Sequence, residues 1–110
     1  MIYISHPYSG NEEENIKETE KIAIKLANKY PKITFINPLA TFHHLEKTKL
    51  SYDDCLDQCL ELLSYCDGVI FTGNWSCSNG CKEEYKFALG RQLFIYETIE
   101  DFIESGYGDV

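Results

Sequence analysis

Residues 69–89, VIFTGNWSCSNGCKEEYKFAL, carry the pattern that decides the fold class. The stretch opens with a short β-branched and apolar run, crosses a loop rich in Gly, Asn and Ser, and ends with helical periodicity. A buried strand followed by a helix is the unit from which parallel sheets are built. We predict a strand over 69–72, a loop over 73–80 and a helix over 80–89. The inward face of this helix is expected to carry Tyr85, Ala88 and Leu89.

The same alternation of strand and helix runs through the rest of the chain. Further strands are predicted at 1–5, 32–37 and 93–97, and further helices at 12–29, from Ser51 or Asp53 to Tyr65, and at 99–104. Strands separated by helices imply a parallel sheet with right-handed crossovers and helices on both faces. We therefore expect one α/β domain over 1–110, a flavodoxin-like or Rossmann-like three-layer fold with a four-stranded parallel sheet in the order 2-1-3-4.

The long helix at 12–29 is expected to bury one stripe of side chains. Either Ser9, which has capping-box spacing to Glu12, or Asn11 should cap its first turn. Its period of about 3.6 residues places the stripe on one face. The predicted stripe is Ile16, Thr19, Ala23, Leu26, Ala27 and Tyr30.

Composition and charge narrow the function classes. The chain has 110 residues, 10 Lys and Arg, 18 Asp and Glu, and a net charge of −8. An acidic domain is unsuited to binding a nucleic-acid backbone or an anionic membrane. The apolar runs are much shorter than the roughly 20 residues that span a bilayer. The N-terminus has no basic leader, so we expect a cytoplasmic protein.

Five cysteines in such a chain are expected to be reduced. Cys55 and Cys59, like Cys77 and Cys81, are four residues apart, a spacing that a four-thiolate zinc site allows. We favour small buried hydrophobic side chains, because the first pair falls inside a predicted helix.

Ligands of open parallel sheets bind beyond the carboxyl ends of the strands. Three loops leave that edge here, at 6–11, 38–52 and 73–80. The first, with Ser5, Ser9 and Gly10, is either a phosphate or sugar cradle or a tight turn. In the second, His43 and His44 are either a proton shuttle or an exposed polar pair. These loops hold most of the Ser, Asn, His and Gly residues, so the site is expected among them.

The loop at 73–80 is the most suggestive. Ser78 and Asn79 are good helix caps, and Gly80 would let a ligand approach the backbone. Glu83 and Glu84 follow one turn later and point about 100° apart, so one can face the cleft. A carboxylate there suits glycosidic chemistry, although a solvated surface Glu is the plainer interpretation. Trp75 either stacks on a base or covers the edge of the core.

Taken together, these motifs resemble the nucleoside 2-deoxyribosyltransferase superfamily. The opening IYISHPYSG is similar to the family's I-Y-I-x-G-P-Y-S-G, and GNWSCSNGCKEEYKFAL is similar to G-W-x-x-S-x-G-A-x-x-E-x-x-x-A. The resemblance is nearest to 2′-deoxynucleoside 5′-phosphate N-hydrolases and to short phage and bacterial proteins. It implies that Glu84 attacks C1′ of the sugar, that Tyr3 orients Glu84, and that Ser78 binds a 5′-phosphate. The substrate-binding residues expected on this basis are Ser5, His6, Pro7, Ser9, Gly10, Trp75, Ser78, Asn79 and Gly80.

Two departures from that pattern bear on catalysis. His6 stands where the family has Gly, and Gln58 and Cys59 stand where its second acid lies. Asp57 is the candidate replacement acid. A missing general acid costs typically about 10²–10⁴-fold in rate.

The sequence therefore supports three functions. The first is cleavage or transfer of the N-glycosidic bond of a nucleoside 5′-monophosphate by a homodimer that needs no cofactor. The second is a non-catalytic nucleotide-binding module. The third is a zinc-bearing interaction domain.

Overall fold

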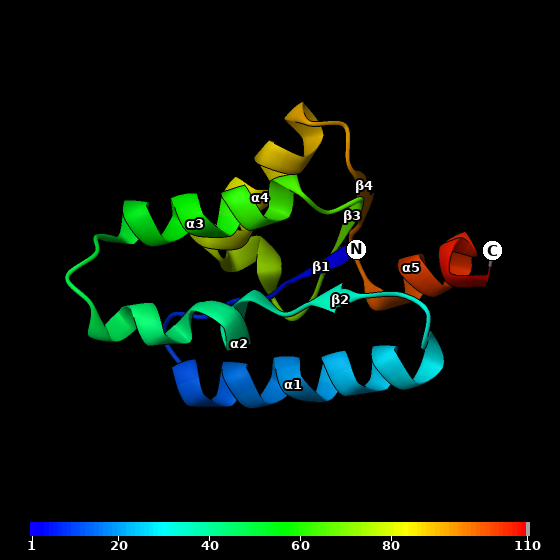
Figure 1. Ribbon diagram of the computed structural model, residues 1–110, viewed down its shortest axis with the longest axis horizontal. Helices are drawn as coiled ribbons and strands as arrows, with labels where there is room; N and C mark the ends of the chain where they lie inside the picture. Colours follow the sequence, from blue (N-terminus) through cyan, green and yellow to red (C-terminus); the bar gives the residue numbers. More distant parts are fainter. Residues whose placement is uncertain (110) are drawn as a thin grey trace.

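The computed structural model describes residues 1–109 and alternates strands with helices (Figure 1). The strands are β1 (Ile2–Ser5), β2 (Phe35–Ile36), β3 (Gly68–Phe71) and β4 (Phe94–Tyr96). The helices are α1 (Glu12–Lys29), α2 (Pro38–Phe42), α3 (Tyr52–Ser64), α4 (Asn79–Gly90) and α5 (Ile99–Ser105). Short 3₁₀ turns span His43–Lys47, Trp75–Cys77 and Tyr107–Asp109.

The four strands form one parallel sheet in the order β2-β1-β3-β4, which confirms the predicted topology and the α/β three-layer class. The two central strands, β1 and β3, are buried throughout and pair from Ile2 with Gly68 to Ser5 with Phe71. The strand order reverses between β1 and β3, so their carboxyl ends form the usual position for a ligand.

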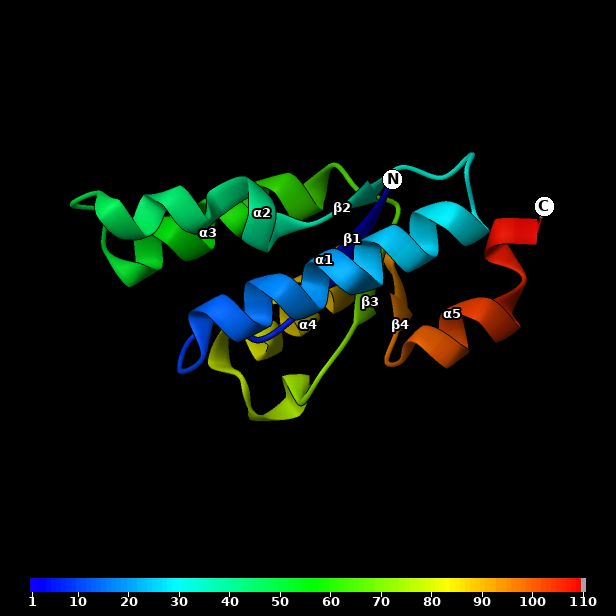
Figure 2. The same ribbon diagram turned by 90° about the horizontal axis from the view of Figure 1, so that it is seen from below.

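Side chains of the central strands point alternately to the two faces of the sheet, and each face packs into its own apolar layer. Ile2, Ile4 and Ile70 pack with Leu26 of α1 and Phe102 of α5 on one face. The residues between them face the opposite side, because successive side chains of a strand alternate. That second layer contains Tyr3, Val69 and Phe71 with Leu63, Cys66, Cys81 and Ala88. Figures 1 and 2 show α1 and α5 on one side of the sheet and α3 and α4 on the other.

Several predicted details differ in the structure. β2 is shorter than 32–37, because the chain is still turning at Ile33, whose amide donates to the carbonyl of Tyr30 at 3.1 Å. α1 begins after Asn11 without a side-chain cap from either predicted residue. Ala27 of α1 and Leu89 of α4 were both expected to face the core, but they are exposed. The buried face of each helix is therefore narrower than predicted.

The segment at 38–52, which the sequence left without a clear pattern, forms α2 and the 3₁₀ turn His43–Lys47. Pro38 occupies the first turn of α2, where its missing N–H costs no hydrogen bond. α3 then begins with a capping box between Ser51 and Asp54, which resolves its predicted start in favour of Ser51. No helix within residues 1–109 has the length and apolar character needed to cross a membrane.

Candidate active site

A buried carboxylate occupies the face of the sheet that α3 and α4 cover. Glu84 lies on α4 and is only 7% exposed. The hydroxyl of Tyr3 donates to Oε2 of Glu84, and the hydroxyl of Ser5 donates to Oε1 at 2.8 Å. Tyr3 and Ser5 both reach this carboxylate because residues two apart on a strand share a face. The expected pairing of Tyr3 with Glu84 is thus present, and Ser5 completes it.

Burial changes the acidity of this carboxyl group. Removal from water raises the pKa of Glu84 from 4.5 to about 7, although the hydrogen bonds from Tyr3 and Ser5 favour the ionised form and oppose this rise. The carboxylate and its protonated form therefore coexist near neutral pH. A nucleophile or a proton-transfer group is most useful with a pKa in that range.

This raised pKa predicts a pH-dependent stability. A folded chain whose carboxyl pKa is about 7 binds a proton that the unfolded chain, at 4.5, releases. The contribution of Glu84 to the free energy of unfolding is therefore greatest below pH 4.5 and falls as the pH rises through 7, by about 3 kcal/mol in total. Glu84→Gln should remove this loss and raise the melting temperature at pH 8 by on the order of 10 °C, with little effect at pH 4.5.

Glu83 is the matched control for this measurement. Its side chain is 48% exposed and lies 3.4 Å from the Lys86 ammonium. Glu83→Gln should leave the pH dependence of the melting temperature unchanged. If Glu84→Gln lowers the melting temperature equally at both pH values, the buried carboxylate does not titrate as described.

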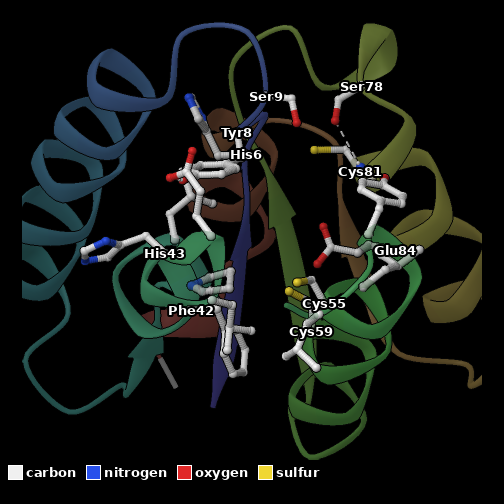
Figure 3. Close-up of a pocket in the computed structure, with 18 of the residues that line it drawn as sticks. His6, Tyr8, Ser9, Phe42, His43, Cys55, Cys59, Ser78, Cys81 and Glu84 are labelled. Carbon is white, nitrogen blue, oxygen red and sulfur yellow. Dashed lines mark hydrogen bonds between the residues drawn. The ribbon is translucent and has the colours of Figure 1, made fainter. Parts of the chain in front are cut away.

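Glu84 faces a cavity of about 300 Å³ at the carboxyl ends of β1 and β3 (Figure 3). Its polar lining includes five more of the predicted site residues: Tyr3, His6, Ser9, Ser78 and Gly80. Most of the remaining wall is apolar or aromatic: Tyr8, Pro38, Leu39, Phe42, Leu45, Leu50, Tyr52 and Leu56. Such a cavity, apolar with a few convergent polar groups, is typical of a small-molecule site.

A second cavity of about 340 Å³ adjoins the first and is lined mainly by polar groups. The two share Ser9, Tyr52, Ser78 and Gly80 in their walls. Pro7 and Asn79, two further predicted site residues from these loops, line the second cavity. It lies at the N-terminus of α4, whose first turn carries no acidic residue. Free amides and the helix dipole favour an anion at such a position.

All the residues that line the two cavities lie in the part of the chain that matches one family. A family model described as a domain of unknown function (DUF4406) matches residues 1–96. The chain belongs to this family. No curated protein and no solved structure matches the chain.

Four predicted site residues of this DUF4406 domain line neither cavity: Ser5, which contacts Glu84 from β1, and Asp57, Trp75 and Gly10. Asp57 is exposed on α3, so the candidate replacement acid is not brought to Glu84. Trp75 stacks on Tyr85 with ring centroids 5.4 Å apart, and its indole N–H donates to the carbonyl of Glu97. Trp75 therefore covers the edge of the core, the second of its two predicted roles. Gly10 adopts a positive φ of 101° in the turn before α1.

His6 has a polar partner beside each ring nitrogen. The Thr72 hydroxyl donates to the carbonyl of Ser5 at 2.9 Å, so it accepts from Nδ1 of His6 at 2.7 Å. Nε2 of His6 lies 3.1 Å from a Glu18 carboxylate oxygen. Burial lowers the pKa of His6, while Glu18 opposes this. Gly73 is needed beside it, because a Cβ there would approach Cε1 of His6 to 2.7 Å.

Several residues that line the cavity were not predicted from the sequence. The Tyr8 hydroxyl donates to Glu46 at 2.6 Å and joins the first loop to the 3₁₀ turn, a pairing with no signal in the sequence. Phe42 and Leu45 also line the cavity and belong to the segment 38–52. In the sequence, their three-residue spacing is a weak sign of a helical turn. His43 lines the rim and both predicted histidines of this segment are exposed.

Two cysteines of α3 line the cavity, and one of them, Cys59, stands where the resembling family carries its second acid. Cys55 and Cys59 line the cavity one helical turn apart on α3, and Figure 3 shows both sulfur atoms on the Glu84 side. Burial, with the Glu84 carboxylate, raises the pKa of Cys59 to about 12. Within residues 1–109, no three His, Cys, Asp or Glu side chains gather to hold a metal ion. The described residues therefore do not form the four-thiolate zinc site considered from the sequence.

Proposed function

We propose that this chain cleaves or transfers the N-glycosidic bond of a nucleoside 5′-monophosphate, with Glu84 as the nucleophile. The observation that carries the proposal is the buried Glu84 carboxylate, held by Tyr3 and Ser5 at the wall of a cavity. The resemblance to nucleoside 2-deoxyribosyltransferases supports the same role for Glu84. It also supports a homodimer, and we propose a cytoplasmic location from the sequence alone.

In this mechanism Glu84 attacks C1′ and the bond from C1′ to the base nitrogen breaks. The base departs with the electron pair of that bond, and the sugar remains as an ester on Glu84. Water, or a second base in a transfer reaction, then attacks C1′ and displaces the carboxylate. The hydroxyls of Tyr3 and Ser5 orient Glu84 and stabilise its negative charge before attack and after release.

The second cavity is the proposed phosphate position. In Figure 3, Ser9 and Ser78 lie at one end of the pocket, Phe42 and Cys59 at the other, and the Glu84 carboxylate between them. A 5′-phosphate beside Ser9 and Ser78 would place C1′ near Glu84 and the base towards Phe42 and Cys59. The test of the proposal is incubation of the protein with nucleoside 5′-monophosphates, followed by chromatographic detection of the free base.

Nucleoside 5′-monophosphates are expected to bind at least about tenfold more tightly than the matching nucleosides, because hydrogen bonds to a charged group contribute about 1.5–3 kcal/mol. Thermal shift titrations of each pair measure this difference. Ser78→Ala should reduce it, although loss of the cap on α4 will also lower the melting temperature of the free protein. Equal affinity for the two members of a pair would contradict the phosphate position.

A non-catalytic nucleotide-binding module is the second candidate. The thiol of Cys59, with its pKa of about 12, faces Glu84 where the resembling enzymes carry a carboxyl group, and it favours this alternative. Nucleotides that bind and stay intact after long incubation would support the module over the enzyme.

A further inference from the structure

A site that protonates a departing base needs an acidic group beside that base. The side chains at the proposed base position are of a different kind. The face of α3 that lines the cavity carries the Cys55 and Cys59 thiols and the Leu56 side chain. The acidic residues of α3 all point to solvent: Asp53, Asp54, Asp57 and Glu61 are exposed. Asp54 is also engaged in the capping box with Ser51. The hydroxyl of Tyr52, at the start of α3, lies beside Gly80 at the proposed phosphate end of the cavity. At the base end, α3 therefore offers thiols and an apolar side chain.

The other proton-bearing groups of the cavity are engaged or remote. Tyr3 donates its hydroxyl to Glu84, and burial beside this carboxylate raises the pKa of Tyr3 well above its usual range. Both ring nitrogens of His6 lie within hydrogen-bond distance of partners. Figure 3 shows the ring of His43 directed away from Glu84, on the opposite side of the pocket. Glu46 is exposed and accepts a hydrogen bond from the Tyr8 hydroxyl.

This arrangement matters because leaving bases differ in their need for a proton. A neutral base that loses its bond to C1′ carries away the electron pair as an anion, unless an acid protonates it. A cationic base, such as a pyridinium ring bonded to C1′ through its nitrogen, leaves as a neutral molecule and needs no proton.

We propose that the preferred substrate is a nucleotide whose base is a cationic N-glycoside, a pyridinium 5′-mononucleotide. This inference rests on the proposed function, because it assigns the same bond cleavage to Glu84. The bond from C1′ to the ring nitrogen breaks, its electron pair neutralises the pyridinium, and C1′ bonds to Glu84. Water then displaces Glu84 and releases one proton to solvent.

The walls of the cavity also suit a cationic ring. Tyr8, Phe42 and Tyr52 contribute aromatic rings to the cavity, and such faces attract a cation. The Glu84 and Glu46 carboxylates line the same cavity, in a chain of net charge −8. The neutral pyridine formed by cleavage would lie against Leu39, Leu45 and Leu56, an apolar surface suited to an uncharged ring.

The experiment compares nicotinamide mononucleotide with the four common ribonucleoside 5′-monophosphates and their 2′-deoxy forms. Free base is measured by chromatography, with Glu84→Gln as the blank. We expect the pyridinium nucleotide to be cleaved faster than the neutral ones by about 10²–10⁴-fold, the usual contribution of a general acid. Dihydronicotinamide mononucleotide, which has nearly the same shape without the cationic ring, should be cleaved as slowly as the neutral nucleotides.

A second arm uses Cys59→Asp, which places a carboxyl group beside the leaving base. It should narrow the rate ratio between the pyridinium and neutral nucleotides by about tenfold or more, whereas Cys59→Ser should not. If the wild-type protein cleaves neutral nucleotides as fast as nicotinamide mononucleotide, this inference is overturned and the proposed function stands. If every nucleotide binds and none is cleaved, both are overturned.

Discussion

Replacing Glu84 with Gln is expected to lower base release by at least about 10³-fold, because the amide cannot form the bond to C1′. The substitution preserves the size of the side chain, and its amide group can still hydrogen-bond to the Tyr3 and Ser5 hydroxyls. Since it also removes a buried charge above pH 7, the variant should be more stable than the wild-type protein. Loss of activity with a gain in stability separates a catalytic role from a structural one.

Glu83→Gln provides the comparison, since Glu83 is the adjacent carboxylate and lies on the solvent side of α4. It should retain most of the wild-type rate. The rate of the wild-type protein should also rise with pH up to about 7, because attack requires the ionised carboxylate of Glu84. A loss of activity in Glu83→Gln comparable with that in Glu84→Gln would contradict the assignment.

Replacing Cys59 with Asp is expected to raise the release of neutral bases by about tenfold or more, towards the 10²–10⁴-fold that a general acid contributes. Cys59 lines the cavity and is close enough for the Glu84 charge to raise its pKa. An Asp there would form a close pair with Glu84, and two neighbouring carboxylates raise the pKa of one of them. The protonated member can then donate to the leaving base.

The folding control for this variant is its melting temperature. A buried carboxyl group without a partner lowers the free energy of unfolding by about 1–3 kcal/mol. Cys59→Ser, which changes the thiol without adding an acid, should leave the rate near that of the wild-type protein. A folded Cys59→Asp protein that releases neutral bases no faster than Cys59→Ser would show that the missing proton donor does not limit the reaction.

The sheet could be predicted from the sequence because its signals are local. Each strand is a short apolar run next to a helix with a clear period, and strands that alternate with helices imply a parallel sheet with right-handed crossovers. The pairing of Tyr3 with Glu84 was reached through motif resemblance. The burial of Glu84 was not predictable from its position on the helix, because it depends on how α4 packs over β1 and β3. The additional bond from Ser5 follows from the same packing.

Other parts of the site depend on contacts between distant residues. Tyr8 and Glu46 meet across 38 residues of sequence, and the wall from Pro38 to Leu50 belongs to short helical turns with weak periodicity. The sequence leaves both roles of Trp75 open, because a loop tryptophan can equally cover a core or stack on a ligand. Only the position of Tyr85 on α4 settles this, since the two rings stack. Asp57 lies on the exposed face of α3 because it is two residues from both Cys55 and Cys59, and two residues turn a helical side chain by about 200°.

The central claim is that Glu84 becomes bonded to the sugar, and the mass of the protein during turnover tests it most directly. The protein is mixed with excess nucleoside 5′-monophosphate or nicotinamide mononucleotide, quenched in acid within the first turnovers, digested and analysed by mass spectrometry. The account predicts an added sugar 5-phosphate on the peptide that contains Glu84, and no such addition in Glu84→Gln. Two results would contradict it. In the first, free base appears but the sugar phosphate is bonded to a different residue. In the second, the nucleotide stays intact and nothing is added to the protein.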